Sequence, residues 1–391
     1  MLNSGMSPWP SFSEEEAEAV KQVILSNKVN YWTGNVCREF EREFATYCGT
    51  KHAIALSNGT LALELALRAV GIGAGDEVIV TPRTFLASAS SIVTVGGSPV
   101  FADVDLDSQN ITAESIRKAI SPKTKAILCV HLAGWPCEMD EINQIAREFG
   151  LKVIEDCAQA HGAKYRGASV GSLSDVAAWS FCQDKIMTTG GEGGMVTTND
   201  TELWNAMWSY KDHGKSWEAV YERQHPPGFR WLHESFGSNW RMLEVQAAIG
   251  RIQLKRMNEW TSVRQQYASQ LDQVAREFNC VRTPEVPSHM EHARYKHYLF
   301  VKPDRLKSGW DRDSIVRSLN EQGVPAQFGS CSEVYLEKAF DNTPWRPQQR
   351  LPNAKLLGET SIMFMVHPTL KTTEMDHACE ALKTVLSQAC R

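Results

Sequence analysis

Several features that mark other protein classes are missing from this sequence of 391 residues. The ten cysteines include no CxxC pair and no metal-finger spacing, which argues against a disulfide framework and against a zinc module. No apolar run reaches the length of a membrane span, and the first residues lack a basic stretch followed by an apolar one. We therefore expect a cytoplasmic protein with no metal site and no membrane partner.

An excess of charge of one sign is also lacking. The chain has 41 Lys and Arg against 46 Asp and Glu, a formal net charge of -5, which gives no general attraction for nucleic acid. No GxGxxG motif follows the early strand, and this disfavours a dinucleotide-dependent oxidoreductase. These absences leave an enzyme acting on small molecules as the first expectation.

Helical and strand-like segments alternate through the first half of the chain. Strands of β-branched and apolar residues are separated by helices of about a dozen residues, a pattern typical of right-handed crossover units. The expected strands lie at 75–82, 99–105, 125–132 and 151–160, and the expected helices lie at 59–73, 87–97, 114–120 and 139–150. The fold class is therefore α/β, with a mainly parallel sheet flanked by helices.

A long helix, expected at about 242–278, divides this region from a smaller C-terminal α+β domain. The smaller domain has two expected strands and two expected helices, at 296–303, 312–323, 361–370 and 374–389. A chain of this length exceeds what one hydrophobic core usually serves. We expect a large domain over 1–250, including a short N-terminal segment, and a small domain over 251–391.

Residues that follow the strands of an open α/β sheet are the first candidates for ligand binding. Ser57, Asn58, Gly59 and Thr60 lead directly into a helix, whose free backbone N–H groups and dipole can hold a phosphate. Ser, Asn and Thr are also ordinary helix caps. This segment alone does not separate the two interpretations.

Two carboxylates, Glu155 and Asp156, end a hydrophobic strand, and Gln159 and His161 follow. A partly buried carboxylate needs a cation or hydrogen-bond donors. A ligand with a protonated ring nitrogen would meet this need at Asp156, with an attraction of about 4 kcal/mol at ~4 Å and an effective dielectric near 20. An aspartate that caps the following helix explains the position equally well.

A third place lies between the expected strands at 175–181 and 188–200. Ser180 ends the first of them, and Lys185 then stands before a cluster of glycines that allows close backbone approach. An amine with little bulk around it can form a Schiff base with an aldehyde. Considered alone, a lysine at this position is more often a solvated surface lysine.

Together, these three places supply what pyridoxal phosphate requires: a phosphate cradle, a carboxylate for the ring nitrogen and a Schiff-base lysine. The sequence resembles the nucleotide-sugar aminotransferases of the DegT/StrS family, which belong to the fold type I pyridoxal-phosphate enzymes. The resemblance covers nearly the whole chain. It is carried, in the family's order, by the stretches 55–89, 124–142, 153–181, 188–200 and 237–254.

The resemblance assigns a role to each candidate. Lys185 is implied to be the catalytic lysine that holds the cofactor as an internal aldimine, and Asp156 to pair with the pyridine nitrogen. The other implied cofactor contacts are Gln159 to the ring hydroxyl, Ser180, Gly59 and Thr60 to the phosphate, Phe85 against the ring face, and Asn239 to the phosphate in the neighbouring subunit. A homodimer with shared active sites follows.

The implied reaction moves an amino group from L-glutamate to a keto sugar on a nucleotide diphosphate. It leaves 2-oxoglutarate and passes through pyridoxamine phosphate. We expect a UDP-linked 2-acetamido-4-keto-6-deoxy sugar as the acceptor, for bacterial surface glycans. A 3-aminotransferase acting on a dTDP- or GDP-linked sugar remains the alternative. A related branch with histidine at the lysine position dehydrates sugars, and Lys185 disfavours that chemistry here.

The segment 211–239 is rich in His, Trp, Gly and Pro and is too long for an ordinary connection. Arg230 and Lys215 within it are candidate diphosphate contacts, with a solvated or dimer-contact loop as the alternative. His161 and Glu192 are left outside the catalytic set because they can simply satisfy hydrogen bonds. A non-enzymatic regulator is also disfavoured, since neither a basic patch nor a helix-turn-helix pattern is present.

Overall fold

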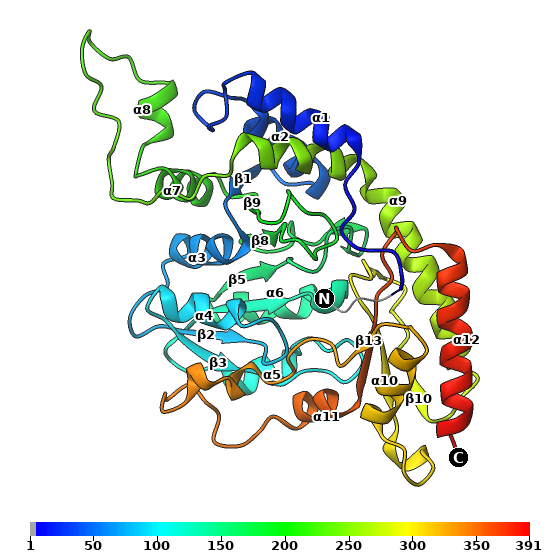
Figure 1. Cartoon of the computed structure of the whole chain (residues 1–391). Helices are drawn as coiled ribbons and strands as arrows, with labels where there is room; N and C mark the ends of the chain where they lie inside the picture. Colours follow the sequence, from blue (N-terminus) through cyan, green and yellow to red (C-terminus); the bar gives the residue numbers. More distant parts are fainter. Residues whose placement is uncertain (1–4) are drawn as a thin grey trace.

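A seven-stranded sheet forms the centre of the computed structural model, which describes residues 5–391 (Figure 1). The strands lie in the order β1-β9-β8-β5-β4-β2-β3. From β8 to β3 the neighbours are parallel, whereas β9 runs antiparallel to both β1 and β8. The strands are β1 (His52–Leu56), β2 (Glu77–Val80), β3 (Ser98–Phe101), β4 (Thr124–Val130), β5 (Lys152–Asp156), β8 (Val176–Ser180) and β9 (Gly194–Thr198).

Both faces of this sheet are buried, because successive side chains of each strand enter different cores. In β1, Ile54 belongs to the core on one face and Ala55 to the core on the other. The first face is covered by α3 (Gly59–Ala69), α4 (Ala87–Thr94) and α7 (Thr201–Lys211). The second is covered by α2 (Val36–Cys48), α5 (Ala113–Ala119), α6 (Met139–Phe149) and the first part of α9 (Glu244–Ala275). The expected α/β class with a mainly parallel sheet is confirmed.

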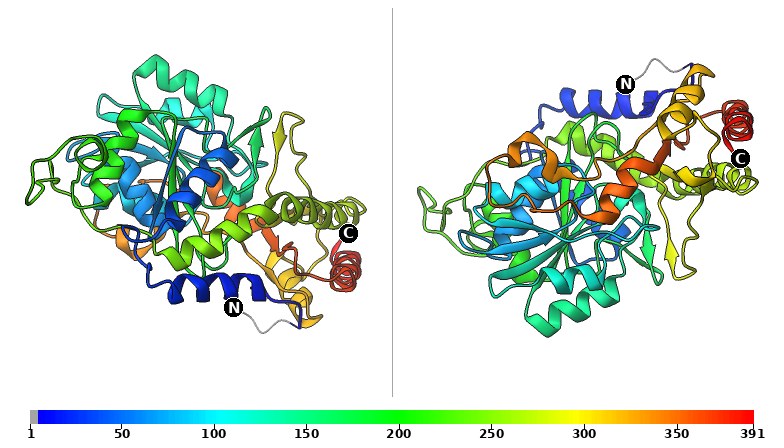
Figure 2. Two further views of the ribbon diagram at one scale, coloured as in Figure 1. Left: turned by 90° about the horizontal axis from the view of Figure 1, so that it is seen from above. Right: turned by 90° about the horizontal axis from the view of Figure 1, so that it is seen from below.

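A second sheet of four strands, in the order β10-β12-β14-β13, belongs to the C-terminal part of the chain. Its apolar residues pack with the end of α9 and with two further helices. The elements are β10 (Val281–Arg282), β12 (His297–Val301), β13 (Ala326–Gln327), β14 (Ser361–Phe364), α10 (Arg312–Glu321) and α12 (Thr372–Ala389). Figure 2 shows α9 running from the large sheet to this smaller layer. A domain boundary near residue 250 stays a prediction.

One C-terminal segment leaves the small sheet and returns to the large one. Val334, Tyr335 and Phe340 are buried in the core that also contains α3 and α4. The segment includes two short 3₁₀ helices and α11 (Pro352–Thr360), and it is drawn in orange below the large sheet in Figure 1. The small domain expected from the sequence therefore contributes to the core of the large one.

The remaining elements lie at the periphery. α1 (Glu14–Leu25) packs along α9, where the buried Glu16 carboxylate accepts hydrogen bonds from Gln253 and Arg256. A three-stranded sheet is formed by β11 (Met290–Glu291), β6 (Lys164–Tyr165) and β7 (Ala168–Ser169). The short α8 (Trp217–Tyr221) begins a segment that projects from the body in Figure 1. Within residues 5–391, no helix has both the length and the apolar character needed to cross a bilayer.

Candidate active site

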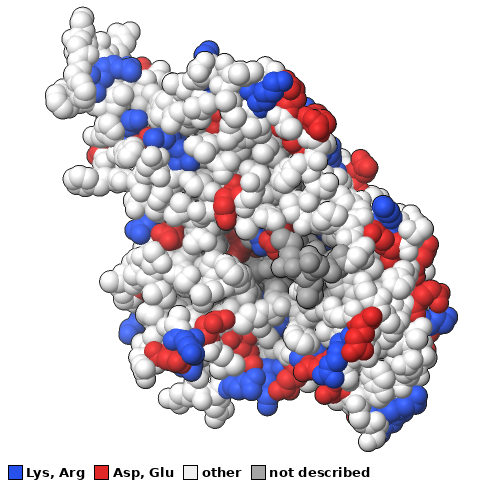
Figure 3. Space-filling view, in the orientation of Figure 1, with Lys and Arg blue, Asp and Glu red and all other residues white. Residues whose placement is uncertain are grey.

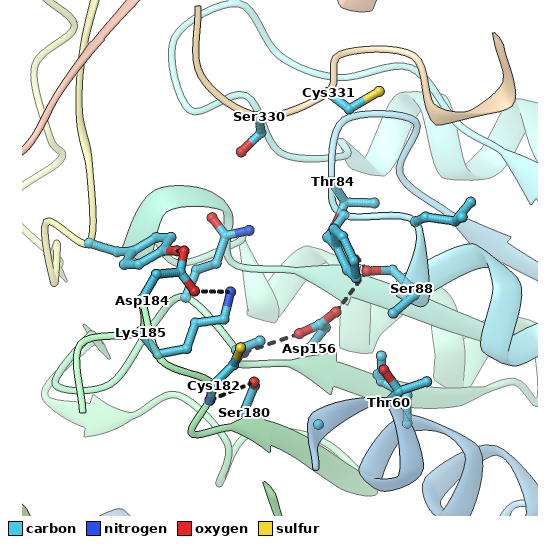
Figure 4. A pocket seen from close by; sticks show the side chains of 18 of the residues that line it. Thr60, Thr84, Ser88, Asp156, Ser180, Cys182, Asp184, Lys185, Ser330 and Cys331 are labelled. Carbon is cyan, nitrogen blue, oxygen red and sulfur yellow. Dashed lines mark hydrogen bonds and ion pairs between the residues drawn. The ribbon is translucent and has the colours of Figure 1, made fainter. Parts of the chain in front are cut away.

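A cavity of about 940 Å³ opens at the carboxyl ends of β5 and β8. Ligand pockets of this size hold a cofactor-sized molecule with room for a second one. Figure 4 shows Asp156, Ser180 and Lys185 on one side of it, with Ser330 and Cys331 of the C-terminal part on the opposite side. Seven of the eight residues predicted from the sequence line this cavity: Gly59, Thr60, Phe85, Asp156, Gln159, Ser180 and Lys185.

Lys185 lies in the connection between β8 and β9, with its side chain in the cavity (Figure 4). Its Nζ is 3.8 Å from Asp184 Oδ1 and 5.1 Å from the centroid of the Tyr295 ring. Its backbone carbonyl accepts a hydrogen bond of 2.8 Å from the indole of Trp9. The amine is therefore held at the cavity and is not a solvated surface group.

Asp156 ends β5 and is only 4% exposed. One carboxylate oxygen accepts a hydrogen bond of 2.8 Å from Ser88 Oγ, and the other accepts one of 3.1 Å from the backbone N–H of Ala158. Burial raises the pKa of Asp156, although these two bonds and the nearby Lys185 act in the opposite direction. A cation brought into the cavity by a ligand would stabilise the ionised form.

Glu155, the preceding residue, points to the other face of the sheet. Its oxygens accept hydrogen bonds from His131 Nε2 at 2.9 Å, Ser174 Oγ at 2.8 Å and the backbone N–H groups of Gly171 and Leu173. Because His131 Nδ1 accepts from the backbone of Cys137, both ring nitrogens are engaged. His131, Glu155 and Cys157 lie close enough for a metal, but these bonds already use the histidine and carboxylate atoms. Glu155 fixes the end of β5 on which Asp156 stands.

The predicted phosphate cradle lies at the beginning of α3. The Asn58 side chain caps this helix by accepting a hydrogen bond of 2.9 Å from the Leu61 N–H, so the cap is observed and phosphate binding stays a prediction. A Cβ atom at Gly59 would lie 2.6 Å from Ser180 Cβ, so only glycine allows this approach of helix and strand. Thr60 is exposed beside it. Small side chains and the free N–H groups at the beginning of α3 therefore surround one part of the cavity.

Two side chains fit the predicted contacts to a flat ring. Gln159 is buried, and its Oε1 accepts a hydrogen bond of 2.8 Å from the Ala133 N–H, which leaves the NH₂ group as the donor for the cavity. Phe85 is 69% exposed although it lines the cavity. An exposed aromatic ring at a cavity wall is consistent with stacking on a ligand.

Asn239 is the one predicted cofactor contact that does not line this cavity. It is exposed and pairs with Asp212 in an isolated bridge at the base of the projecting segment. Lys215, a candidate diphosphate contact, is engaged within the chain, because its Nζ lies 3.3 Å from Asp212 Oδ1 and 4.1 Å from the centroid of the Trp32 ring. Arg230 is exposed on the projecting segment.

Sequence reasoning missed several further polar residues of the cavity, among them Ser88, Asp184, Tyr295 and Lys296. Asp184 was adjacent to the predicted lysine and could have been proposed as its partner. Tyr295 and Lys296 precede β12, more than one hundred residues further along the chain, and no local pattern marks them. Their place in the site depends on how the small sheet sits against the large one.

His161 and Glu192 were left outside the catalytic set. His161 is buried against Trp179 and Phe181, and neither ring nitrogen has a hydrogen-bond partner among residues 5–391. Burial, together with the positive charges of Lys185 and Arg264, lowers the pKa of His161 to about 3. It is therefore neutral at physiological pH. Glu192 lines the cavity.

Comparison with known proteins decides the family. The sequence profile of the DegT/DnrJ/EryC1/StrS aminotransferase family matches residues 10–383. The chain belongs to this family. Members of the DegT/DnrJ/EryC1/StrS family depend on pyridoxal phosphate, and the expected recognition, enzyme class and cofactor are confirmed.

Individual relatives agree with this. The GDP-perosamine synthase of Caulobacter vibrioides is 42% identical over 376 residues, covering 94% of this chain and 95% of that protein. The dTDP-3-amino-3,6-dideoxy-alpha-D-galactopyranose transaminase of Aneurinibacillus thermoaerophilus is 34% identical, covering 95% of each chain. The solved aminotransferase from Psychrobacter cryohalolentis matches with a TM-score of 0.97 and 59% identity, covering 98% of this chain and 99% of that one. The protein is an aminotransferase of this family.

The residues present fit the cofactor. A buried carboxylate that lacks an ion-pair partner among residues 5–391, the close approach of Gly59 to Ser180 and an amine at the cavity are the features that a protonated pyridine ring, a phosphate and an aldehyde require. The individual contacts of Gly59, Thr60, Phe85, Asp156, Gln159, Ser180, Lys185 and Asn239 stay predictions.

Proposed function

We propose that this protein transfers the amino group of L-glutamate to the keto carbon of a 4-keto-6-deoxy sugar linked to a nucleotide diphosphate. The product would be an amino sugar for a bacterial surface glycan. The observation that carries the proposal is the meeting of Lys185 and Asp156 in one cavity, with the start of α3 beside them. Space remains above these groups, toward Ser330 and Cys331, for a second ligand.

Each protein group has a task in this reaction. Bound pyridoxal phosphate supplies the aldehyde and the ring that takes up electrons from the donor. Lys185 anchors the cofactor and, once the donor amine has replaced it, moves a proton at the α-carbon of the donor. Asp156 holds the ring nitrogen protonated by its negative charge. Gly59, Thr60 and Ser180 hold the phosphate at the helix start.

The identity of the acceptor's nucleotide and the sugar carbon that receives the amino group are also part of this proposal. Relatives named for GDP- and dTDP-linked sugars both align along almost the whole chain. Because the relative at 42% identity is named a GDP-perosamine synthase, a GDP-linked 4-keto-6-deoxy sugar is the first acceptor to assay. The UDP-linked 2-acetamido-4-keto sugar expected from the sequence is the second, and a 3-keto sugar is the alternative.

A homodimer is also part of the proposal. Phe229, Trp231 and Phe236 on the projecting segment are 77%, 81% and 99% exposed. In Figure 3 this part of the surface, at the upper left, is mostly white, with one group of Lys or Arg side chains. Large exposed apolar groups on an extension indicate a surface for a partner. Asn239 at its base would then reach the cofactor phosphate of the second copy.

The substrate assignment is tested with a panel of GDP-, dTDP- and UDP-linked 4-keto-6-deoxy sugars together with their 3-keto isomers. Each is incubated with L-glutamate and the cofactor-loaded protein, and products are followed by mass spectrometry. We expect the mass of the amino sugar from at least one 4-keto substrate. Conversion of 3-keto sugars alone, or of none of the panel, would contradict the assignment.

The role of Lys185 is tested by Lys185→Ala. We expect turnover and the visible absorbance of the bound cofactor to be lost, because Lys185 is the lysine whose charge acts on Asp156. The control is Lys164→Ala, which removes an exposed lysine paired with Glu291. An unchanged visible spectrum in Lys185→Ala would refute this role.

A further inference from the structure

A second ammonium group, that of Lys296, stands at the wall of the same cavity. Lys296 immediately precedes β12, and its Nζ is 4.6 Å from the centroid of the Tyr295 ring. Its one hydrogen-bond contact is with the sulfur of Met365, at 3.1 Å, and a thioether is a weak acceptor. Within residues 5–391, no carboxylate comes within 4.0 Å of this Nζ. Lys296 is therefore a cation without an ion-pair partner in the described part of the chain.

Two other positive charges, those of Lys185 and Arg264, lie near Lys296 and add to its need for an anion. Lys185 and Lys296 are the cationic side chains among the described residues that line the cavity. Behind them, Arg264 is 1% exposed, packs on Trp9, and has no hydrogen-bond partner for Nε or Nη2 among residues 5–391. Asp184 is the nearby acid, and it already contacts Lys185 and accepts a hydrogen bond from Tyr295.

The pKa of Lys296 reflects these surroundings. Burial lowers it to about 8, and the positive charges of Arg264 and Lys185 act in the same direction, whereas Asp184 opposes them. The pKa of His367 is lowered to about 3 by burial and by the positive charges of Arg264 and Lys296. An unpaired buried ammonium is costly, and an anionic ligand removes this cost. The wall is therefore suited to a negatively charged group.

We propose that Lys296 binds a carboxylate of the amino-acid donor. This inference rests on the proposed function, in which the donor and the sugar occupy the cavity in turn. The donor nitrogen must reach the carbon that Lys185 holds, so the donor carboxylates lie within a few bonds of that point. Lys185 and Lys296 both contact the Tyr295 ring, so the two ammonium groups are at most about 10 Å apart, within the reach of an amino-acid donor that reacts at Lys185.

The sugar substrate carries no negative charge next to its reacting carbon. Its keto carbon is flanked by neutral hydroxyl or methyl groups, and its diphosphate is attached across the ring. A cation beside the reacting carbon therefore favours the donor over the acceptor. Lys296 would let one cavity distinguish two substrates that use the same reacting atoms, because only one of them carries a charge there.

The proposal is tested on the separate half-reactions of the cofactor-loaded protein. Lys296→Met keeps the length of the side chain and removes the charge, and Lys296→Arg restores a cation. Lys302→Met, at an exposed lysine just after β12, is the matched control. Reaction with L-glutamate and L-alanine is followed by the visible absorbance. The acceptor half-reaction starts from protein loaded with pyridoxamine phosphate, and binding of the unreactive dicarboxylate glutarate is measured by calorimetry.

For Lys296→Met we expect the half-saturating glutamate concentration and the Kd of glutarate to rise about 10- to 100-fold, as expected for loss of a charge-assisted hydrogen bond. Lys296→Arg should recover part of this loss, and Lys302→Met should show none. The half-saturating sugar concentration should stay unchanged. Equal losses with glutamate and alanine would place the α-carboxylate on Lys296, and a loss with glutamate alone would place the side-chain carboxylate there.

Unchanged glutamate and glutarate binding in Lys296→Met would overturn the proposal. A loss confined to the sugar would also overturn it, because Lys296 would then serve the diphosphate. Circular dichroism checks folding, and Lys296→Gln replaces the methionine variant if that variant does not fold. If the unaltered protein consumes glutamate but converts no sugar, the proposed function fails while the role of Lys296 is still tested.

Discussion

The predicted task of Asp156 is to hold a protonated ring nitrogen by its negative charge. With the ring nitrogen at ~4 Å, its charge is worth about 4 kcal/mol at an effective dielectric near 20. Asp156→Asn keeps the shape and hydrogen bonds but removes that charge. We expect kcat/KM to fall roughly 10³-fold, since each 1.36 kcal/mol changes a rate tenfold.

The measurement for Asp156→Asn is steady-state turnover, with the visible spectrum to show that the cofactor still binds. Ser88→Ala is the control, because it removes one hydrogen-bond donor to Asp156 and leaves the charge. A rate for Asp156→Asn close to that of the unaltered protein would mean that the carboxylate does not face the ring nitrogen.

Among single residues of the site, the sequence predicted several that come directly after an apolar strand. It did not predict Ser88 and Lys296, which do not directly follow a strand. Asp156, Ser180 and Lys185 were predicted because apolar strands lead directly to them, and all three line the cavity. Ser88 lies within α4 and Lys296 lies before a strand of the other sheet. No local pattern connects these two positions to Asp156, so only the packing of the elements brings them to the site.

At the scale of an element, strand β5 depends on the buried contact between Glu155 and His131. Burial alone would raise the pKa of Glu155, but the donors from His131, Gly171 and Ser174 lower it overall. The ionised carboxylate therefore stabilises the fold above its ordinary pKa of about 4.5, and this contribution is lost as the pH falls through the depressed folded value.

For Glu155→Gln we expect the free energy of unfolding near pH 7 to fall by about 3 kcal/mol, because a buried charged contact is broken. The difference from the unaltered protein should shrink as the pH falls below about 4, measured by urea denaturation. Glu291→Gln, at an exposed pair with Lys164, should cost less than about 1 kcal/mol. A difference that does not depend on pH would contradict the ionised state of Glu155.

Among the elements, the alternating helices and strands of the large sheet were predicted because their period and their length are local properties. The sequence did not predict that β9 runs antiparallel to its neighbours. The direction of a strand depends on how the connection before it crosses the sheet, and here that connection is the loop that holds Lys185. The return of Val334, Tyr335 and Phe340 to the large core was not predicted either. Their apolar character says that they are buried, but it does not say against which sheet.

At the scale of the whole molecule, the proposed shared site predicts complementation between two inactive variants. Lys185→Ala lacks the amine, and Asn239→Asp would place a negative charge beside the phosphate of the second copy. In an equal mixture that exchanges subunits, half of the dimers are mixed and each has one intact site. We therefore expect recovery of about a quarter of the unaltered activity.

The mixture is compared with one in which Lys185→Ala is combined with the double variant Lys185→Ala/Asn239→Asp, which should recover nothing. Sedimentation analysis gives the oligomeric state. No recovery in the first mixture, despite dimers and subunit exchange, would show that Asn239 serves its own chain, and full activity of Asn239→Asp alone would show that it serves neither site.

The cavity wall formed by Met363 has a consequence for biosynthesis of the protein. Met363 belongs to β14, the central partner of β12 and β13, and it follows the Lys185 loop by more than 170 residues. Translation adds about 5 to 20 residues each second, and earlier regions fold first. During translation the cofactor therefore meets an incomplete cavity. We expect stable binding of the cofactor only after β14 has left the ribosome.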